Sequence, residues 1–160
     1  MFKKILLALG DSTESQEILS AGLTLAEKLG AEVLLLHVIN PMSPNGYSPL
    51  VGGIFPMVNE VVLDRYAKEW REYQQRGIEQ LQTYADLAKD RGIQVEVSQN
   101  FGNSGSMICE VAKNWSADAI VMGRNQKSMM SEIFLGSTSN YVLHHAACSV
   151  MVIQLPALPS

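Results

Sequence analysis

Residues 5–39 read ILLALGDSTESQEILSAGLTLAEKLGAEVLLLHVI, and this stretch decides the fold. Its two ends, 5–9 and 33–39, are short continuous apolar runs, which are typical of strands buried on both faces. A capping box begins at Thr13 between them, and apolar residues then recur at helical spacing until Gly30. A strand, a helix and a second strand in this order predict a parallel pair joined by a right-handed crossover.

The rest of the chain continues the alternation of helices and strands. The strand after the long helix alternates apolar and polar residues, so it is expected near an edge of the sheet. The predicted elements are a long helix over 62–88 that ends at Arg91-Gly92, a strand over 93–98, a helix over 107–115 capped by Ser104 or Ser106, a strand over 119–122, a helix over 137–146 and a strand over 149–155.

Five strands alternating with helices predict one α/β domain over residues 1–160, with an open, doubly wound (Rossmann-like), five-stranded parallel sheet and helices on both faces. Residues 40–58 carry prolines and glycines without periodicity and are interpreted as a mobile loop, and 156–160 as a frayed tail. The long helix carries an apolar and aromatic stripe from Val62 to Ala88, which is interpreted as core rather than as a cofactor site.

Composition narrows the class of protein. A hydrophobic fraction of 47% and a charged fraction of 18% are typical of globular chains, and a net charge of −4 without charge blocks argues against nucleic acid or an anionic membrane as partner. The first apolar run stops at Gly10, too short for a signal peptide, and no later run could span a membrane. Cys109 and Cys148 have no motif spacing and suit a reducing compartment, so a cytoplasmic protein is expected.

Three loops, 10–15, 40–56 and 123–140, reach the carboxyl ends of the strands, where open α/β sheets bind ligands. Residues 136–139, Gly-Ser-Thr-Ser, begin a helix, and its free amides and positive dipole end suit a phosphate, with Arg124 and Lys127 able to add charge. A serine cap that touches no ligand is the alternative. Neither a P-loop nor a G-x-G-x-x-G motif is present.

Several segments resemble the universal stress protein family over nearly the whole chain: KKILLALGDSTES (3–15), LLLHVI (34–39), ADAIVMG (117–123), LGSTSNYVL (135–143) and CSVMVI (148–153). The nucleotide-binding branch of that family carries G-x2-G-x9-G-[ST]. Here Gly123 and Gly136-Ser137 keep the spacing, whereas Gln126 stands at the middle glycine.

The resemblance implies binding of ATP or AMP, with or without magnesium, and no metal ligands can be named. Phosphates would lie beside the glycines and the 136–139 helix start, and adenine and ribose beside the strand ends. Asp11 stands one residue later than the family's aspartate, so its contact with ribose or a metal stays open. The candidate ligand-contacting residues are Ala8, Leu9, Asp11, Val38, Met122, Gly123, Arg124, Gln126, Gly136, Ser137, Thr138 and Ser139.

The remaining polar residues favour binding over catalysis. Only Asp11 and Glu132 are carboxylates near this edge, too few for phosphoryl transfer. His144 and His145 are interpreted as cations of a last helical turn rather than metal ligands. Asp118 is interpreted as marking a strand entry, and His37 as a hydrogen-bonded core histidine.

Three functions stay open. The first is a cytoplasmic, homodimeric sensor or regulator of the stress response that binds an adenine nucleotide. The second is a dimer without nucleotide that acts through protein contacts, which Gln126 favours. The third is an enzyme similar to ATP pyrophosphatases, because LGDSTES (9–15) distantly resembles the S-G-G-x-D-S loop of that group. A homodimer is expected to pair the last strand, Ser149 to Gln154, with its own copy, since an apolar edge strand needs cover.

Overall fold

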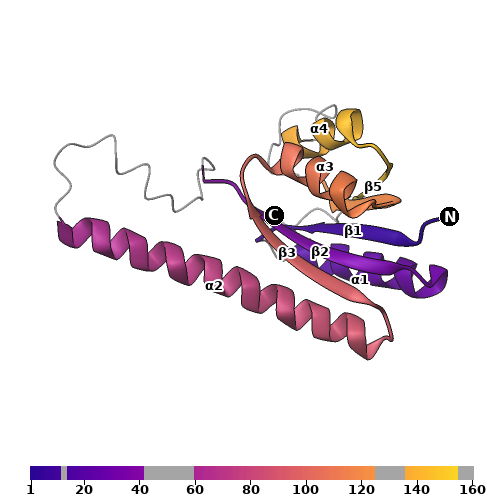
Figure 1. Cartoon of the computed structure of the whole chain (residues 1–160), viewed down its shortest axis with the longest axis horizontal. Helices are drawn as coiled ribbons and strands as arrows, with labels where there is room; N and C mark the ends of the chain where they lie inside the picture. Colours follow the sequence, from indigo (N-terminus) through magenta and orange to yellow (C-terminus); the bar gives the residue numbers. More distant parts are fainter. Residues whose placement is uncertain (12–13, 42–59, 125–135, 155–160) are drawn as a thin grey trace, which may run out of the picture.

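A computed structural model describes residues 1–11, 14–41, 60–124 and 136–154. They form a five-stranded parallel sheet in the order β3-β2-β1-β4-β5 (Figure 1). The strands are β1 (Lys4–Leu9), β2 (Glu32–Ile39), β3 (Val95–Phe101), β4 (Ala119–Gly123) and β5 (Ser149–Ile153), and the helices are α1 (Glu14–Leu29), α2 (Glu60–Asp90), α3 (Ser104–Trp115) and α4 (Ser137–His145).

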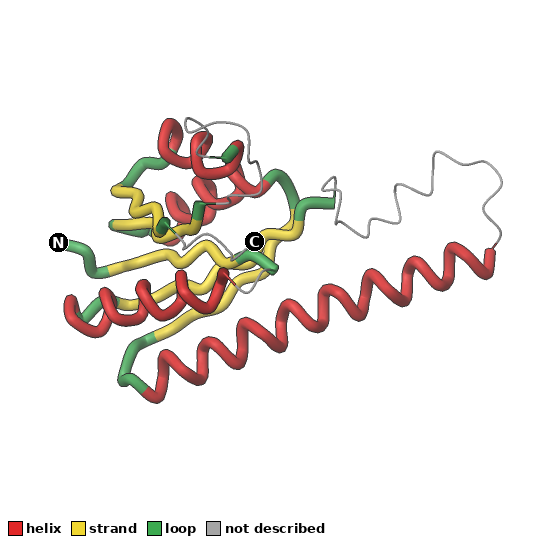
Figure 2. Tube along the Cα trace, turned by 180° about the vertical axis from the view of Figure 1, so that it is seen from behind, coloured by secondary structure: helices red, strands yellow, loops and turns green. Residues whose placement is uncertain are grey.

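The predicted fold class is confirmed. All four strand pairs are parallel, the third and last strands lie at the two edges, and helices cover both faces (Figure 2). The predicted cap Thr13, the predicted loop from residue 42 onward and the predicted tail lie outside the described residues.

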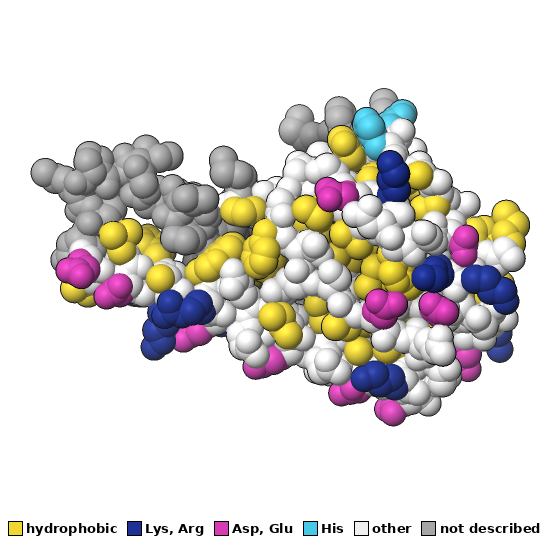
Figure 3. All heavy atoms as spheres, in the orientation of Figure 1, with side chains coloured by type: hydrophobic (Ala, Val, Ile, Leu, Met, Phe, Trp, Pro, Cys, Tyr) yellow, Lys and Arg dark blue, Asp and Glu magenta, His cyan; other side chains and the backbone are white. Residues whose placement is uncertain are grey.

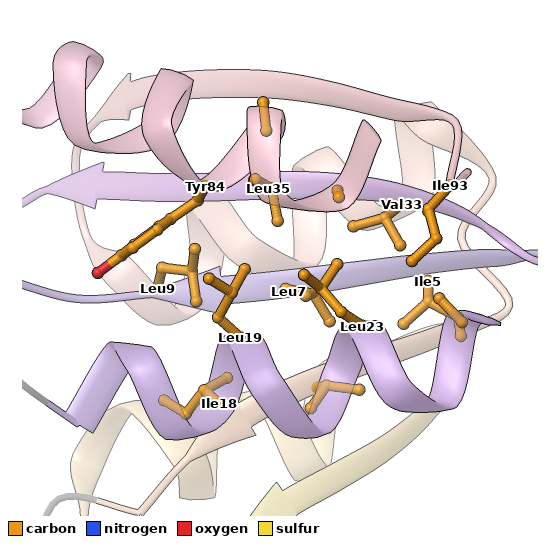
Figure 4. Packing of buried hydrophobic residues seen from close by; sticks show 14 of the residues in the cluster. Ile5, Leu7, Leu9, Ile18, Leu19, Leu23, Val33, Leu35, Tyr84 and Ile93 are labelled. Atoms are coloured by element: carbon orange, nitrogen blue, oxygen red, sulfur yellow. The ribbon is translucent and has the colours of Figure 1, made fainter. Parts of the chain in front are cut away.

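Alternation along the central strand divides the interior into two cores. Ile5, Leu7 and Leu9 of β1 pack with α1 and α2, whereas Leu6 packs with α3 and α4. Figure 4 shows the first of these cores, in which the side chains of β1 and β2 meet those of α1 and the aromatic ring of Tyr84 from α2. Because β1 is buried on both sides, its sequence is apolar at every position from 5 to 9.

The two largest errors in the predicted boundaries both lie after α2, and the last strand also ends earlier than predicted, at Ile153. The third strand begins at Val95 and runs to Phe101, because Ile93 belongs to the turn that ends α2, where its amide donates to the Ala88 carbonyl. The cap of α3 is Asn103, whose side chain accepts a hydrogen bond from the Ser106 amide at 3.2 Å. Asparagine is as good a cap as serine, so composition alone did not decide between them.

The interpretation of the α2 stripe as core is correct for only half of the helix. Leu81, Tyr84, Ala85 and Ala88 are buried against the sheet. Val62 and Tyr66 of the same stripe are 40% and 43% exposed. The helix has 31 residues, about 46 Å at 1.5 Å per residue, and its first half runs beyond the end of the sheet (Figure 1).

We expect Gly22→Ala to destabilise the protein although alanine is the better helix former. A Cβ at residue 22 would lie 2.6 Å from Leu7 Cδ1, so α1 sits against β1 at a distance that only glycine allows. Overpacking of this kind costs about 1–3 kcal/mol, against about 1 kcal/mol of helix propensity. In a Leu7→Val background the δ-carbons are gone, and the same change should become neutral or stabilising. Urea unfolding of the parent, Gly22→Ala, Leu7→Val and the double variant measures the change in the free energy of unfolding. An equal effect of Gly22→Ala in both backgrounds would contradict the expectation.

Candidate functional site

The carboxyl edge of the sheet contains a point where the chain leaves neighbouring strands toward opposite faces. β1 lies between β2 and β4; α1, which follows β1, packs on one face, and α4, which follows β4, packs on the other (Figure 1). In open α/β sheets such a reversal opens a crevice between the two strand ends. The candidate residues that the structure describes lie at the ends of β1, β2 and β4, in the segments that follow β1 and β4, and at the start of α4.

Three of the candidate residues share one face. Ala8, Val38 and Met122 come from the ends of three adjacent strands, and all three pack with the core beneath α3 and α4. Ala8 pairs directly with Met122 in the sheet. Leu9 belongs to the opposite face, where it is 5% exposed in the core with α1 and α2, so its side chain is not brought to the other three.

Among the described residues, the start of α4 has no side-chain cap. Gly136 occupies the cap with φ 79° and ψ 149°, a conformation that is essentially restricted to glycine. No side chain of this cap accepts a hydrogen bond from the first amides of the helix, whereas Asn103 does so for α3. Ser137 is exposed and Thr138 is half-buried at the same end. Free amides and the positive end of the helix dipole favour an anion here.

The hydroxyl of Ser139, a candidate ligand-contacting residue, is bonded within the fold. It is 3% exposed, and its Oγ donates to the Gly123 carbonyl at 3.2 Å, so the hydroxyl fixes the start of α4 against the end of β4. The neighbouring Arg124 amide donates to the Ile153 carbonyl at 3.1 Å. The Nε of Arg124 is buried and has no hydrogen-bond partner among the described residues. Gln126, Lys127 and Glu132 lie outside the described residues.

The end of β1 is tied to the start of α1 by a serine that the sequence reading did not single out. Ser15 is fully buried; its Oγ donates to the Gly10 carbonyl at 2.6 Å and accepts from the Gly10 amide at 3.0 Å. The two hydrogen bonds fix Gly10 at the crevice. A serine in the first turn after a strand is the signal that could have indicated them.

Asp11 turns away from Ala8 and Met122, toward α2. Its carboxylate forms an ion pair with His37 Nε2 at 2.7 Å and accepts a hydrogen bond from the Tyr73 hydroxyl. His37 is 5% exposed, and its Nδ1 lies 3.0 Å from Gln99 Oε1. The interpretation of His37 as a hydrogen-bonded core residue is confirmed. Its partner Asp11, a candidate ligand-contacting residue whose contact stayed open, is bound to His37 and Tyr73.

The contact between Asp11 and His37 shifts the pKa of both residues. The hydrogen bond from His37 lowers the pKa of Asp11 below its ordinary value of 3.8, despite the opposing effect of burial. Burial alone would lower the pKa of His37, but the hydrogen bonds to Asp11 and Gln99 outweigh it and hold this pKa above 6.5. Burial and Asp11 together raise the pKa of Tyr73.

We expect the stability supplied by this pair to be largest between pH 3.8 and 6.5. A raised His37 pKa stabilises the fold fully below 6.5 and loses its effect as pH rises through the folded value. A lowered Asp11 pKa stabilises above 3.8 and loses its effect as pH falls. The difference in urea midpoint between the parent and His37→Gln should therefore shrink from pH 5.5 to pH 9.5. His144→Gln, an exposed change, serves as control; a constant His37 difference would contradict the expectation.

Asp118, His144 and His145 lie in places that fit a structural role rather than ligand binding. Asp118 accepts hydrogen bonds from the Lys3 and Lys4 amides, as expected for a strand entry, and these bonds lower its pKa. His144 and His145 lie in the last turn of α4, where His145 stacks on Tyr141 with ring centroids 4.0 Å apart. Within the described ranges, no three histidine, cysteine or acidic side chains are placed to hold a metal ion.

Two further expectations concern the cysteines and the membrane. Cys109 and Cys148 are free thiols, and burial raises the pKa of both. None of the helices in the described part of the chain has the length and apolar character needed to cross a membrane.

Comparison with known proteins adds to this geometry. The model of the universal stress protein family matches residues 1–154. The universal stress protein Sll1388 of Synechocystis is 32% identical over 159 residues, which cover 96% of this chain and 98% of the relative.

Solved structures have the same fold. Hypothetical protein MJ0577 superposes with a TM-score of 0.77 at 22% identity and 99% coverage of both chains. A universal stress protein solved in complex with cAMP gives a TM-score of 0.63 at 16% identity, covering 96% of this chain and 97% of that one. One from Archaeoglobus fulgidus, solved with dAMP, gives 0.55 at 19% identity, with 95% and 98% coverage.

Proposed function

Because the chain belongs to the universal stress protein family, we propose that it binds an adenine nucleotide, ATP or AMP, in the crevice between the carboxyl ends of β1 and β4. The start of α4 carries this proposal. Gly136 has no side chain that could accept from the first amides of the helix, no other cap is present among the described residues, and Gly123 ends the neighbouring strand without a side chain that could block a phosphate. Two relatives of the same fold were solved with cAMP and dAMP, which supports an adenine nucleotide as the ligand class.

The nucleotide would lie across both parts of the crevice. Its phosphates would meet the amides of Gly136 to Thr138, and Ser137 would donate its exposed hydroxyl. The adenine and ribose would pack on Ala8 and Val38, which are half-buried on one face of the sheet, beside Met122, which is buried in the core of the same face. In this arrangement Ser139 positions the helix start rather than contacting the ligand, and Asp11 stays with His37.

We further propose that the protein works by binding rather than by catalysis, as a cytoplasmic sensor or regulator of the stress response. Phosphoryl transfer needs carboxylates that hold a metal ion, and Asp11 is already engaged by His37 and Tyr73. Bound nucleotide would stabilise one arrangement of the crevice by RT ln(1 + [L]/Kd). The two free thiols fit the reducing interior of a cell.

The proposed assembly is a homodimer paired along the last strand. β5 is an edge strand, and Met151 at its centre is 45% exposed, so the described chain leaves an apolar edge uncovered. Pairing Ser149 to Gln154 with the same segment of a second copy about a two-fold axis would satisfy its amides.

We expect adenine nucleotides to raise the melting temperature of the purified protein. At a ligand concentration of about 100 times Kd the stabilisation is ~2.7 kcal/mol, which for a chain of this size is a shift of about 5–10 °C. Fluorescence-monitored melting with ATP, AMP and, as control, GTP measures it. No shift at millimolar ATP or AMP would favour the dimer without nucleotide, and turnover of ATP with magnesium would favour the enzyme.

A further inference from the structure

Four polar side chains meet beside the proposed nucleotide site, on the other face of the sheet. Asp11 follows β1, His37 is in β2, Gln99 is in β3 and Tyr73 is in α2, and hydrogen bonds join them in one chain. The backbone of α2 comes close to this cluster, since a Cβ at Gly77 would lie 3.0 Å from His37 Nδ1. The proposed binding of nucleotide uses none of these contacts.

The hydrogen-bonding partners determine the protonation state of His37. The amide of Gln99 donates through Nε2 to the Gln74 carbonyl at 3.1 Å, and this bond directs Oε1, an acceptor, toward His37 Nδ1. The other ring nitrogen faces the carboxylate of Asp11, which is also an acceptor. Both ring nitrogens must therefore carry a proton, and only the imidazolium satisfies both contacts.

The cluster lies where α2 leaves the sheet. Toward the carboxyl end of the helix, the buried residues Leu81 to Ala88 anchor it in the core. Toward the amino end, Val61 and Tyr66 are 71% and 43% exposed, and Figure 3 shows hydrophobic side chains exposed among charged ones over this half of the helix. Between these two regions, the Tyr73 hydroxyl donates to Asp11 after β1, the Gln74 carbonyl accepts from Gln99 of β3, and the ring of Trp70 lies 6.1 Å from that of Phe101.

We propose that the protonated His37 is a latch: it holds Asp11, which through Tyr73 holds the middle of α2 against the sheet, and loss of the proton releases this part of the helix. When His37 loses a proton, one ring nitrogen presents a lone pair to an acceptor, either Asp11 or Gln99. If Nε2 loses the proton, its contact with Asp11, the partner of Tyr73, becomes repulsive; if Nδ1 loses it, its contact with Gln99, which also binds the Gln74 carbonyl of α2, becomes repulsive. The stretch of α2 around residues 66–77, which has few buried residues, separates from the sheet first.

In the part of the chain that the structure describes, few charged groups act on His37. From the loop after β1, Asp11 supplies the negative charge, and from β3, Gln99 is neutral. From α2, Tyr73 contributes a hydroxyl, and the charge of Arg76 acts on Tyr73. Asp11 therefore determines that the protonated form of His37 is the one that closes the latch, since it is the one carboxylate that contacts the imidazolium in the described part of the chain.

Nuclear magnetic resonance of the histidine ring nitrogens tests the first half of this proposal, in protein without nucleotide. His37 of the parent should titrate above 6.5 with both nitrogens protonated below that transition. In Asp11→Asn the charge is lost while the shape remains, so burial should bring the titration below 6.5. Tyr73→Phe should leave the raised value in place. A parent His37 that titrates below 6.5 overturns the proposal.

Hydrogen exchange read by mass spectrometry tests the second half, at pH 6 and pH 9 with labelling times corrected for intrinsic exchange. Peptides covering 65–77 should lose protection several-fold at pH 9 in the parent, while a peptide from α3 does not. In Tyr73→Phe the same peptides should have low protection at both pH values, although His37 keeps its raised pKa. Equal protection at the two pH values in the parent, or normal protection in Tyr73→Phe, overturns the latch. Neither result depends on whether a nucleotide binds.

Discussion

Gly136→Val is expected to lower the affinity for ATP or AMP about 100-fold, or by ~2.7 kcal/mol, and so to remove most of the melting shift. The cap glycine has φ 79° and ψ 149°, which a β-branched residue adopts only at a cost of about 1–3 kcal/mol. Valine would relax by turning the first amides of α4 away from the crevice. Its side chain would also occupy the space that a phosphate needs. Titration calorimetry of parent and variant measures the difference.

Gly92→Val is the matched control. Gly92 also has a positive φ, 73°, and a Cβ there meets nothing within 4 Å. It lies between the end of α2 and the start of β3, whereas the crevice lies where the strands end. Both variants should lose stability in urea, and only Gly136→Val should lose affinity. If Gly136→Val binds as tightly as the parent, the phosphates do not contact the start of α4.

Met151→Lys is expected to convert the proposed dimer into monomer at micromolar concentration. Met151 is the central residue of β5 (Ser149–Ile153), so a two-fold axis through the centre of this strand would place residue 151 beside its own copy. Two facing lysines would weaken association by ~2.7 kcal/mol, or about 100-fold. Val152 is a poorer choice, because its side chain packs in the core beneath α3 and α4, and a lysine there would damage the fold.

Val97→Lys provides the comparison at the other edge of the sheet. Val97 lies in β3 and is 43% exposed, close to the exposure of Met151. Sedimentation velocity should find Val97→Lys in the same state as the parent. A monomeric Val97→Lys beside a dimeric Met151→Lys would place the interface at β3 instead.

The sheet was predictable because its strands are buried on both faces. The runs 5–9, 33–39 and 119–122 contain almost no polar residue, and each became a strand with a shift of one residue at most. β3 was harder, since Gln99 and Asn100 are polar and yet continue the strand by pairing with His37 and Val38. Polar residues of an edge strand do not differ in pattern from those of a loop.

The candidate site was predictable only in part. The helix start at Gly136 follows from the Gly-Ser-Thr-Ser sequence. Ala8, Val38 and Met122 were named from the resemblance to the family, and the structure places these three on one face of the sheet. The pairing of Asp11 with His37 does not, because it depends on how α2 crosses the sheet. Local spacing carries no information on a contact between residues from four separate elements. The same holds for Gly22 and Gly77, whose packing partners lie on other elements.

The position of β1 in the sheet bears on how the chain is made on the ribosome. Ile5 pairs on one side with Val33, which is synthesised soon afterwards, and on the other with Ala119, which emerges only after most of the chain is complete. Until then β1 has an open edge, and Leu6, Leu34 and Leu36 lack the helices that bury them in the finished protein. Nascent chains that stop before residue 119 should therefore bind chaperones and aggregate, and release should follow once β4 has left the exit tunnel.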